Sequence, residues 1–119
     1  MQKISHYRDL NVWKKGIEIV KTIYTSTKKF PSEERYGLIT QMQRSAVSIP
    51  SNIAEGFRRG HNKELKRFLH IALGSCAELE TQVIISGELG YIEKTCNNAF
   101  LEQLDVLSRM LVSFIKKIN

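Results

Sequence analysis

The sequence is poor in residues that break helices or cross-link small folds. Its 119 residues include two prolines, two cysteines and one tryptophan. Two cysteines are too few for a disulfide framework, so we expect Cys76 and Cys96 to be reduced thiols buried in helices. So few prolines favour long helices joined by short loops.

Long apolar runs and a leader pattern are also missing. No apolar run approaches the roughly 20 residues that span a bilayer. The first ten residues, MQKISHYRDL, have no apolar stretch of the kind found in signal peptides. We therefore expect a cytoplasmic protein with no membrane partner.

Signals for catalysis and for cofactors are missing as well. There is no Gly-rich phosphate loop, nucleophile elbow or Cys-x-x-Cys motif. A di-iron bundle needs Glu-x-x-His pairs on facing helices, and none of the three histidines belongs to such a pair. We expect a protein with no catalytic residues, no metal and no cofactor.

The sequence does have helical periodicity. Apolar residues recur at steps of three and four in four segments, and no segment alternates like a strand. With Asp9, Ser32 and Asn62 as N-caps, we predict four helices. They run from about Asp9 to Lys29, from Ser32 to Phe57, from Asn62 to an end between Gly87 and Gly90, and from about Lys94 to Lys117. Breaks this short make sequential helices antiparallel. The predicted fold is all-α: one domain, residues 1–119, forming an antiparallel up-down four-helix bundle.

Pro50 falls inside the second predicted helix. An interior proline costs about 3 kcal/mol and kinks a helix, yet the apolar stripe from Met42 to Phe57 keeps its phase across it. We therefore predict one Pro-kinked helix. The same helix has a second row of apolar residues beside this stripe: Ile39, Ala46, Pro50 and Ala54. Two rows exceed what one buried face needs, which predicts a surface for a partner. The alternative is a single wide stripe that is buried inside the monomer.

A polar ladder runs along the same helix. Four side chains spaced four, four and three residues apart share one face: Arg44, Ser48, Asn52 and Glu55. Folding the chain at the Gly60 turn brings Arg44 opposite Glu78, which predicts a partly buried ion pair. Gly74 predicts close packing of the second and third helices. We interpret the ladder as a packing and register device, and the alternative is a ligand pocket around Asn52, Glu55 and His70.

Basic residues gather around the turn between the second and third helices. The net charge is +6, and a basic surface attracts polyanions. We predict nucleic-acid binding by Arg58, Arg59, His61, Lys63, Lys66 and Arg67. No base-reading motif accompanies them, so binding would follow the backbone of RNA or DNA. The alternatives are a solvated helix end without a ligand and a helix-turn-helix reader of DNA.

Several segments resemble one bacterial family: YRDLNVW, FPSEERYGL, RSAVSIPSNIAEG, ALGSCAELET and ELGYI. They are similar to the four-helix bundle proteins encoded in intervening sequences of 23S rRNA genes, which are related to the accessory variability proteins of diversity-generating retroelements. The resemblance implies a homopentamer of four-helix subunits around a central channel. For the retroelement relatives it implies a basic assembly that binds nucleic acid and engages a reverse transcriptase.

Together these features predict a non-enzymatic, oligomeric accessory protein that binds nucleic acid through a basic face. The alternative is a scaffolding module for another protein, in which the basic residues serve solubility or an acidic partner.

Overall fold

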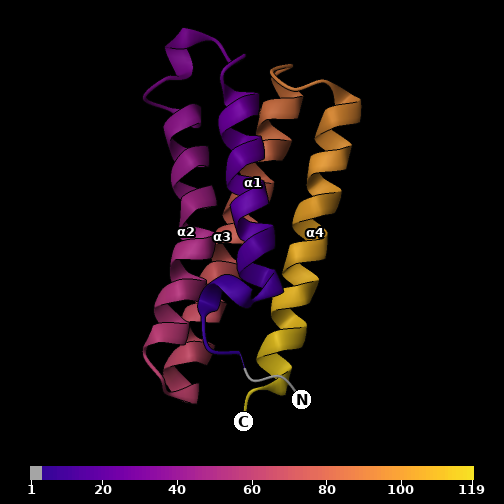
Figure 1. The fold of residues 1–119 in the computed structure, drawn as a ribbon. Coiled ribbons are helices and arrows are strands. Elements are labelled where there is room, and N and C mark those ends of the chain that lie inside the picture. The colour runs from indigo at the N-terminus through magenta and orange to yellow at the C-terminus, as the bar shows by residue number, and fades with distance from the viewer. Residues whose placement is uncertain (1–3) are drawn as a thin grey trace.

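Four helices make up most of the computed structural model, which describes residues 4–119. Two single 3-10 turns precede α1 and α2, and the chain order is η1 (Tyr7–Asp9), α1 (Asn11–Thr27), η2 (Ser32–Glu34), α2 (Leu38–Arg58), α3 (Asn62–Glu88) and α4 (Lys94–Lys117). Successive helices run in opposite directions, and α1 closes the bundle against α4 (Figure 1). No strand occurs in this range, and the predicted all-α, up-down four-helix bundle is confirmed.

The antiparallel order brings distant parts of the chain to the same end of the bundle. The bundle is 46 Å long and 25 by 19 Å across. One end holds η1, the α2–α3 turn and the C-terminus, and the other holds the α1–α2 and α3–α4 connections (Figure 1). Because α2 and α3 are long and lie antiparallel, they form a helical hairpin and not the crossed pair of a helix-turn-helix reader.

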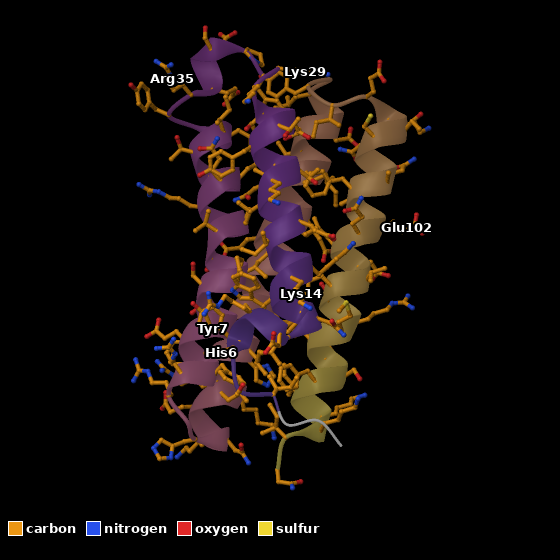
Figure 2. All side chains as sticks on the ribbon, in the orientation of Figure 1. His6, Tyr7, Lys14, Lys29, Arg35 and Glu102 are labelled. Carbon is orange, nitrogen blue, oxygen red and sulfur yellow. The ribbon has the colours of Figure 1, made fainter. Side chains whose placement is uncertain are left out.

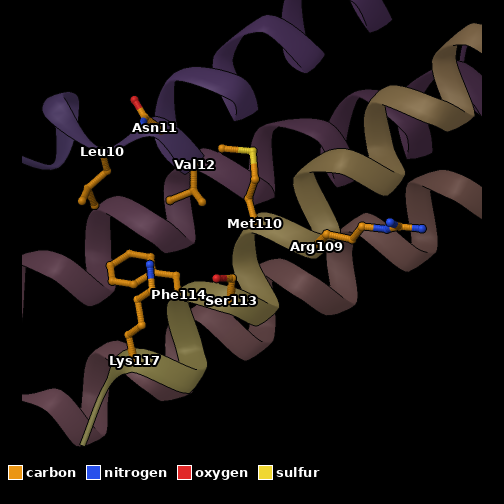
Figure 3. Close-up of a pocket in the computed structure, with 8 residues that line it drawn as sticks. All are labelled: Leu10, Asn11, Val12, Arg109, Met110, Ser113, Phe114 and Lys117. Atoms are coloured by element: carbon orange, nitrogen blue, oxygen red, sulfur yellow. The ribbon is translucent and has the colours of Figure 1, made fainter.

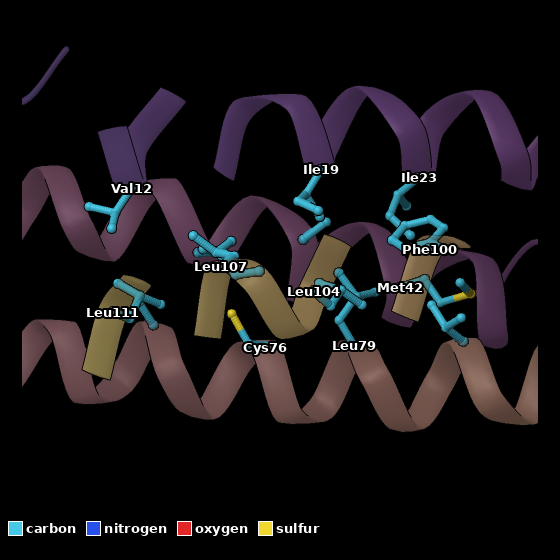
Figure 4. Close-up of a cluster of buried hydrophobic side chains, with 14 of the residues drawn as sticks. Val12, Ile19, Ile23, Met42, Cys76, Leu79, Phe100, Leu104, Leu107 and Leu111 are labelled. Atoms are coloured by element: carbon cyan, nitrogen blue, oxygen red, sulfur yellow. The ribbon is translucent and has the colours of Figure 1, made fainter. Parts of the chain in front are cut away.

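One face of each helix contributes to the core. Val12, Ile19 and Ile23 of α1 pack toward Leu104 and Leu107 of α4, and residues of α2 and α3 complete the same cluster (Figure 4). Full burial of an aliphatic side chain of this size stabilises the fold by about 1.5–3 kcal/mol. Burial of these apolar side chains therefore stabilises the bundle, and both cysteines are free thiols.

The two cysteines differ in their surroundings. Cys76 is fully buried in the core, as predicted. Burial raises the pKa of its thiol to about 11, although a hydrogen bond with Ser108 lowers it. A neutral thiol of this kind is inert at neutral pH. Cys96 is exposed, so the prediction of burial was wrong for that residue, which lies on the outer side of the first turn of α4.

Two helices begin later than the cap residues predict, and the third begins at Asn62 as predicted but with a different cap residue. Asp9 belongs to a 3-10 turn, and α1 begins at Asn11. α2 begins only at Leu38, whose amide donates a hydrogen bond to the Glu34 carboxylate at 3.2 Å. His61 is the N-cap of α3, one residue earlier than predicted. The cap-forming residues mark the breaks correctly, but 3-10 turns occupy the first two of them.

Pro50 packs inside the helical bundle. α2 continues through Pro50 as one helix, and the kink itself stays a prediction. A Cβ atom added at Gly16 of α1 would lie 3.4 Å from the proline ring. Ala46, on the same row, is fully buried. The second apolar row of α2 is therefore mainly part of a wide buried stripe and not a partner surface.

Part of the apolar surface that remains exposed lies on α3. Ile71, Ile84 and Ile85 are 39%, 47% and 43% exposed, and Glu78 is the only exposed charge between them. We define the α3 outer face as Ile71, Gly74, Ala77, Ile84 and Ile85. Because of this face, α3 is long and apolar enough to meet simple criteria for a membrane span. Core helices of bundles meet the same criteria, and the opposite face of α3 packs into the core.

Candidate nucleic-acid interface

The basic residues predicted to bind nucleic acid lie together where α2 turns into α3. α2 ends at Arg58 and α3 begins at Asn62. Gly60 between them has a φ of 75°, a left-handed conformation that favours glycine. All of these basic side chains are exposed except Lys66, which is half-buried. We call this set the basic end: Arg58, Arg59, His61, Lys63, Lys66 and Arg67.

A close approach of α2 and α3 fixes the geometry of the basic end. A Cβ atom added at Gly56 would lie 2.7 Å from the Cβ of Phe68 and 3.3 Å from the carbonyl oxygen of Leu65. Only glycine allows the two helices to come this close without a shift. The side chain of Phe68, 7% exposed, fills the space beside the turn.

Two arginines of the basic end contact the Phe68 ring. The guanidinium carbons of Arg59 and Arg67 lie 5.1 and 5.2 Å from its centroid, within the range of cation–π contacts. Arg59 also pairs with Glu55 at 2.8 Å, and Arg67 with Glu64 at 3.5 Å. The hydrogen bond to Glu55 raises the pKa of Arg59. These contacts restrict the rotamers of both arginines.

Tyr7, Arg8 and Trp13 also lie at this end, and the sequence did not predict them as part of the site. Figure 2 shows His6 and Tyr7 beside the C-terminal half of α2. The guanidinium carbon of Arg58 lies 5.7 Å from the Tyr7 centroid, and that of Arg8 lies 6.0 Å away. The rings of Tyr7 and Trp13 meet edge-on with centroids 5.6 Å apart. The only local feature of the sequence that could have pointed to them is the adjacent pair Tyr7 and Arg8 before the first helix.

The predicted polar ladder is shorter in the structure. The hydroxyls of Ser48 and Ser75 form a hydrogen bond of 2.9 Å between α2 and α3, and Asn52 donates to the carbonyl and hydroxyl oxygens of Ser48 at 2.8 and 2.9 Å. Arg44 and Glu78 are both exposed, and no ion pair joins them. The predicted pair was wrong because mirroring residues about a turn gives their height along the bundle but not the side of the helix they occupy.

One further prediction about this region, close packing at Gly74, was wrong. Nothing lies within 4 Å of a Cβ atom added at Gly74, because this residue is on the α3 outer face and not against α2. The alternative ligand pocket is not formed either: Asn52 bonds to its own helix, Glu55 pairs with the basic end, and His70 is exposed. No cluster of His, Cys, Asp and Glu in the described part of the chain could hold a metal ion.

A surface hollow of about 460 Å³ lies between the start of α1 and the last turns of α4. Figure 3 shows its largely apolar lining, which includes Leu10, Val12 and Phe114. Arg109, which points away from the hollow in this view, is paired with Asp105 at 3.0 Å. The polar side chains of the lining are all exposed, so the hollow offers no preformed polar site.

Comparisons with known proteins agree with this architecture. A crystal structure of a protein of unknown function from the S23 ribosomal protein family of Bacteroides thetaiotaomicron has the same fold, with a TM-score of 0.82 and 24% identity over 89% of this chain and 96% of that one. No curated protein matches the chain. The family model described as 23S rRNA-intervening sequence protein matches residues 8–113, which include the whole basic end. The chain therefore belongs to the 23S rRNA-intervening sequence protein family.

Proposed function

We propose that this protein binds the phosphate backbone of RNA or DNA through its basic end and has no catalysis of its own. The observation that carries the proposal is the placement of Arg59 and Arg67 on Phe68, beside Arg58 and Lys63 at a tight turn. Arginine forks and lysine point charges are the groups that hold phosphates. Attraction of this kind does not depend on nucleic-acid sequence.

The uneven distribution of charge between the two ends supports the proposal. The acidic residues among the cations of the basic end and η1 are Asp9, Glu55 and Glu64. They stand against six Lys and Arg residues: Arg8, Arg58, Arg59, Lys63, Lys66 and Arg67. At the opposite end four cations are balanced by four carboxylates: Lys28, Lys29, Arg35 and Lys94 against Glu33, Glu34, Glu88 and Glu93.

A salt titration of binding tests this function. Fluorescence anisotropy would follow labelled RNA and DNA oligonucleotides with the wild-type protein and with a basic-end variant, in which Arg58, Arg59, Lys63 and Arg67 are all replaced by Gln. We expect wild-type affinity to fall steeply with salt. The slope of log K against log salt should become shallower by about one unit for each phosphate contact that the variant loses.

The matched control removes the same charge from the other end. It replaces Lys28, Lys29, Arg35 and Lys94 with Gln; Lys29 and Arg35 are labelled at that end in Figure 2. We expect this control to bind as the wild type does. An equal loss in both variants would mean that only net charge matters. No binding by the wild-type protein to any RNA or DNA at low salt would refute the proposal.

We also propose that the protein self-associates through the α3 outer face. Its exposed isoleucines and single charge have the character of a buried interface, and Gly74 and Ala77 would let the backbone of a second copy approach. By the family resemblance the assembly is a homopentamer. A ring would repeat the basic end in every subunit, and several weak contacts would then act together.

Further partners follow from the same resemblance and the same surface. We propose a reverse transcriptase or another protein as a partner, and the cytoplasm as the location. A protein scaffold without a nucleic-acid role is the second candidate function, and the exposed apolar α3 outer face favours it. The basic-end variant separates the two functions, because a scaffold would assemble and bind its protein partner unchanged.

Light scattering tests self-association. We expect a wild-type mass several times the 13.7 kDa of one chain. Ile85→Lys should shift the mass toward one chain because it places a charge in the interface. Val47→Lys, at a position of α2 with similar exposure, 40% against 43%, should leave the mass unchanged. A wild-type monomer at high concentration would contradict the proposal.

A further inference from the structure

Two partly exposed aromatic rings border the basic end. Tyr7 contacts the guanidinium groups of Arg8 and Arg58, and its ring meets that of Trp13 edge-on. Tyr7 and Trp13 are only partly buried, whereas Phe68, the ring that Arg59 and Arg67 contact, is 7% exposed. Tyr7 and Trp13 are therefore the aromatic residues that stay partly accessible to solvent close to the groups that would hold phosphates.

We propose that the nucleic acid bound at the basic end is single-stranded, with an unpaired base stacked at Tyr7 and Trp13; this inference rests on the proposed function. Arg8 and Arg58 would hold the adjacent phosphates. Proteins that bind single strands without sequence preference combine a cationic track with aromatic rings, because every base has a π-face. The arginine planes add to such a stack.

A duplex would use these residues less well. Its bases are paired and stacked on one another, so a base reaches Tyr7 or Trp13 only after it has been unpaired at a cost in free energy. A duplex would therefore contact only the cations of the basic end. The rings predict a preference for single strands over duplexes, which the cations alone do not.

Tyr7 also joins the two parts of the site. It belongs to η1, whereas Arg58 ends α2, and their contact fixes Arg8 next to the basic end. Removal of the ring thus takes away one stacking surface and leaves every cation in the chain. This separation allows stacking to be tested without a change in charge.

Trp13 provides the measurement, because it is the only tryptophan in the chain. The wild-type protein is titrated with oligouridylate, with oligothymidylate and with an RNA duplex of equal length. We expect both single strands to quench the fluorescence of Trp13 and to bind more tightly than the duplex. Tyr7→Ser should weaken single-strand binding by about 5- to 100-fold with little effect on the duplex, and Tyr7→Phe should bind like the wild type.

Tyr36→Ser is the matched control. Tyr36 is 89% exposed and lies in the α1–α2 connection at the opposite end, so binding should not change. Circular dichroism melting verifies that each variant is folded. The stacking proposal would be overturned if folded Tyr7→Ser bound single strands as tightly as the wild type does, or if the wild type preferred the duplex. Either result would leave the proposal of nucleic-acid binding at the basic end intact. No binding of the wild type to any of the three ligands would instead refute the proposed function.

Discussion

Gly56 decides, at the scale of single residues, how closely α2 and α3 approach beside Phe68. An added methyl group would overlap the Cβ of Phe68 at 2.7 Å and press on the backbone of Leu65. We predict that Gly56→Ala lowers the free energy of unfolding by about 1–3 kcal/mol through overpacking. Urea unfolding at low protein concentration measures this change.

Gly74→Ala is the control for Gly56→Ala. Nothing lies within 4 Å of the added methyl group at Gly74, so the better helix propensity of alanine should raise the free energy of unfolding by up to about 1 kcal/mol. If Gly56→Ala were as stable as the wild type, the close approach of the two helices would not be as described.

Residues of the site could be predicted only where their signal is local. The cations of the basic end follow one another around a glycine turn, so composition and spacing were enough to group them. Tyr7 and Arg58 are far apart in the sequence, and only the packing of η1 on α2 brings them together. The Arg44–Glu78 pair failed for a related reason, because rotation about a helix axis depends on the core.

The periodicity of apolar residues predicted correctly which segments are helices, but it predicted the ends of the helices less accurately. α3 and α4 have nearly the predicted ends because short polar or glycine-containing breaks adjoin long apolar stripes. α1 and α2 start later than predicted because Asp9 and Ser32 enter 3-10 turns. Cap residues indicate where a chain can leave a helix, but they do not distinguish an α-helix from a short 3-10 turn.

At the scale of secondary-structure elements, a side-chain contact joins the α1–α2 connection to the α3–α4 connection. The Tyr91 hydroxyl, in the α3–α4 turn, donates a hydrogen bond of 3.0 Å to Glu34 of η2, and its ring lies 5.3 Å from that of Phe30. The bond to Glu34, together with burial, raises the pKa of Tyr91. The protonated phenol is therefore favoured by folding. Its stabilisation is complete below about pH 10 and is lost as the pH rises through the higher folded-state pKa.

Tyr91→Phe tests this contact. The variant should unfold at lower urea than the wild type at pH 8, where the wild-type phenol is protonated and bonded. The difference between the two proteins should narrow as the pH rises above about 10. If the difference in urea midpoint between the two proteins were the same at pH 8 and above about pH 10, the stabilisation would come from packing and not from the hydrogen bond.

At the scale of the whole molecule, the proposed function depends on the antiparallel topology. Because the bundle runs up and down, η1 and the α2–α3 turn share one end, while the second end carries balanced charge. The predicted up-down bundle already implied that the α2–α3 turn and the N-terminal segment lie near each other. It did not imply that aromatic rings and arginines meet there, because that depends on how η1 leaves the bundle.

Photo-crosslinking tests most directly whether nucleic acid binds at the basic end. An oligouridylate carrying thiouridine is irradiated with the wild-type protein, and the crosslinked peptides are mapped. We predict crosslinks within residues 7–13 and 58–67. Crosslinks confined to residues 28–36 or 88–94 at the opposite end, or spread over all helices without preference, would contradict the account.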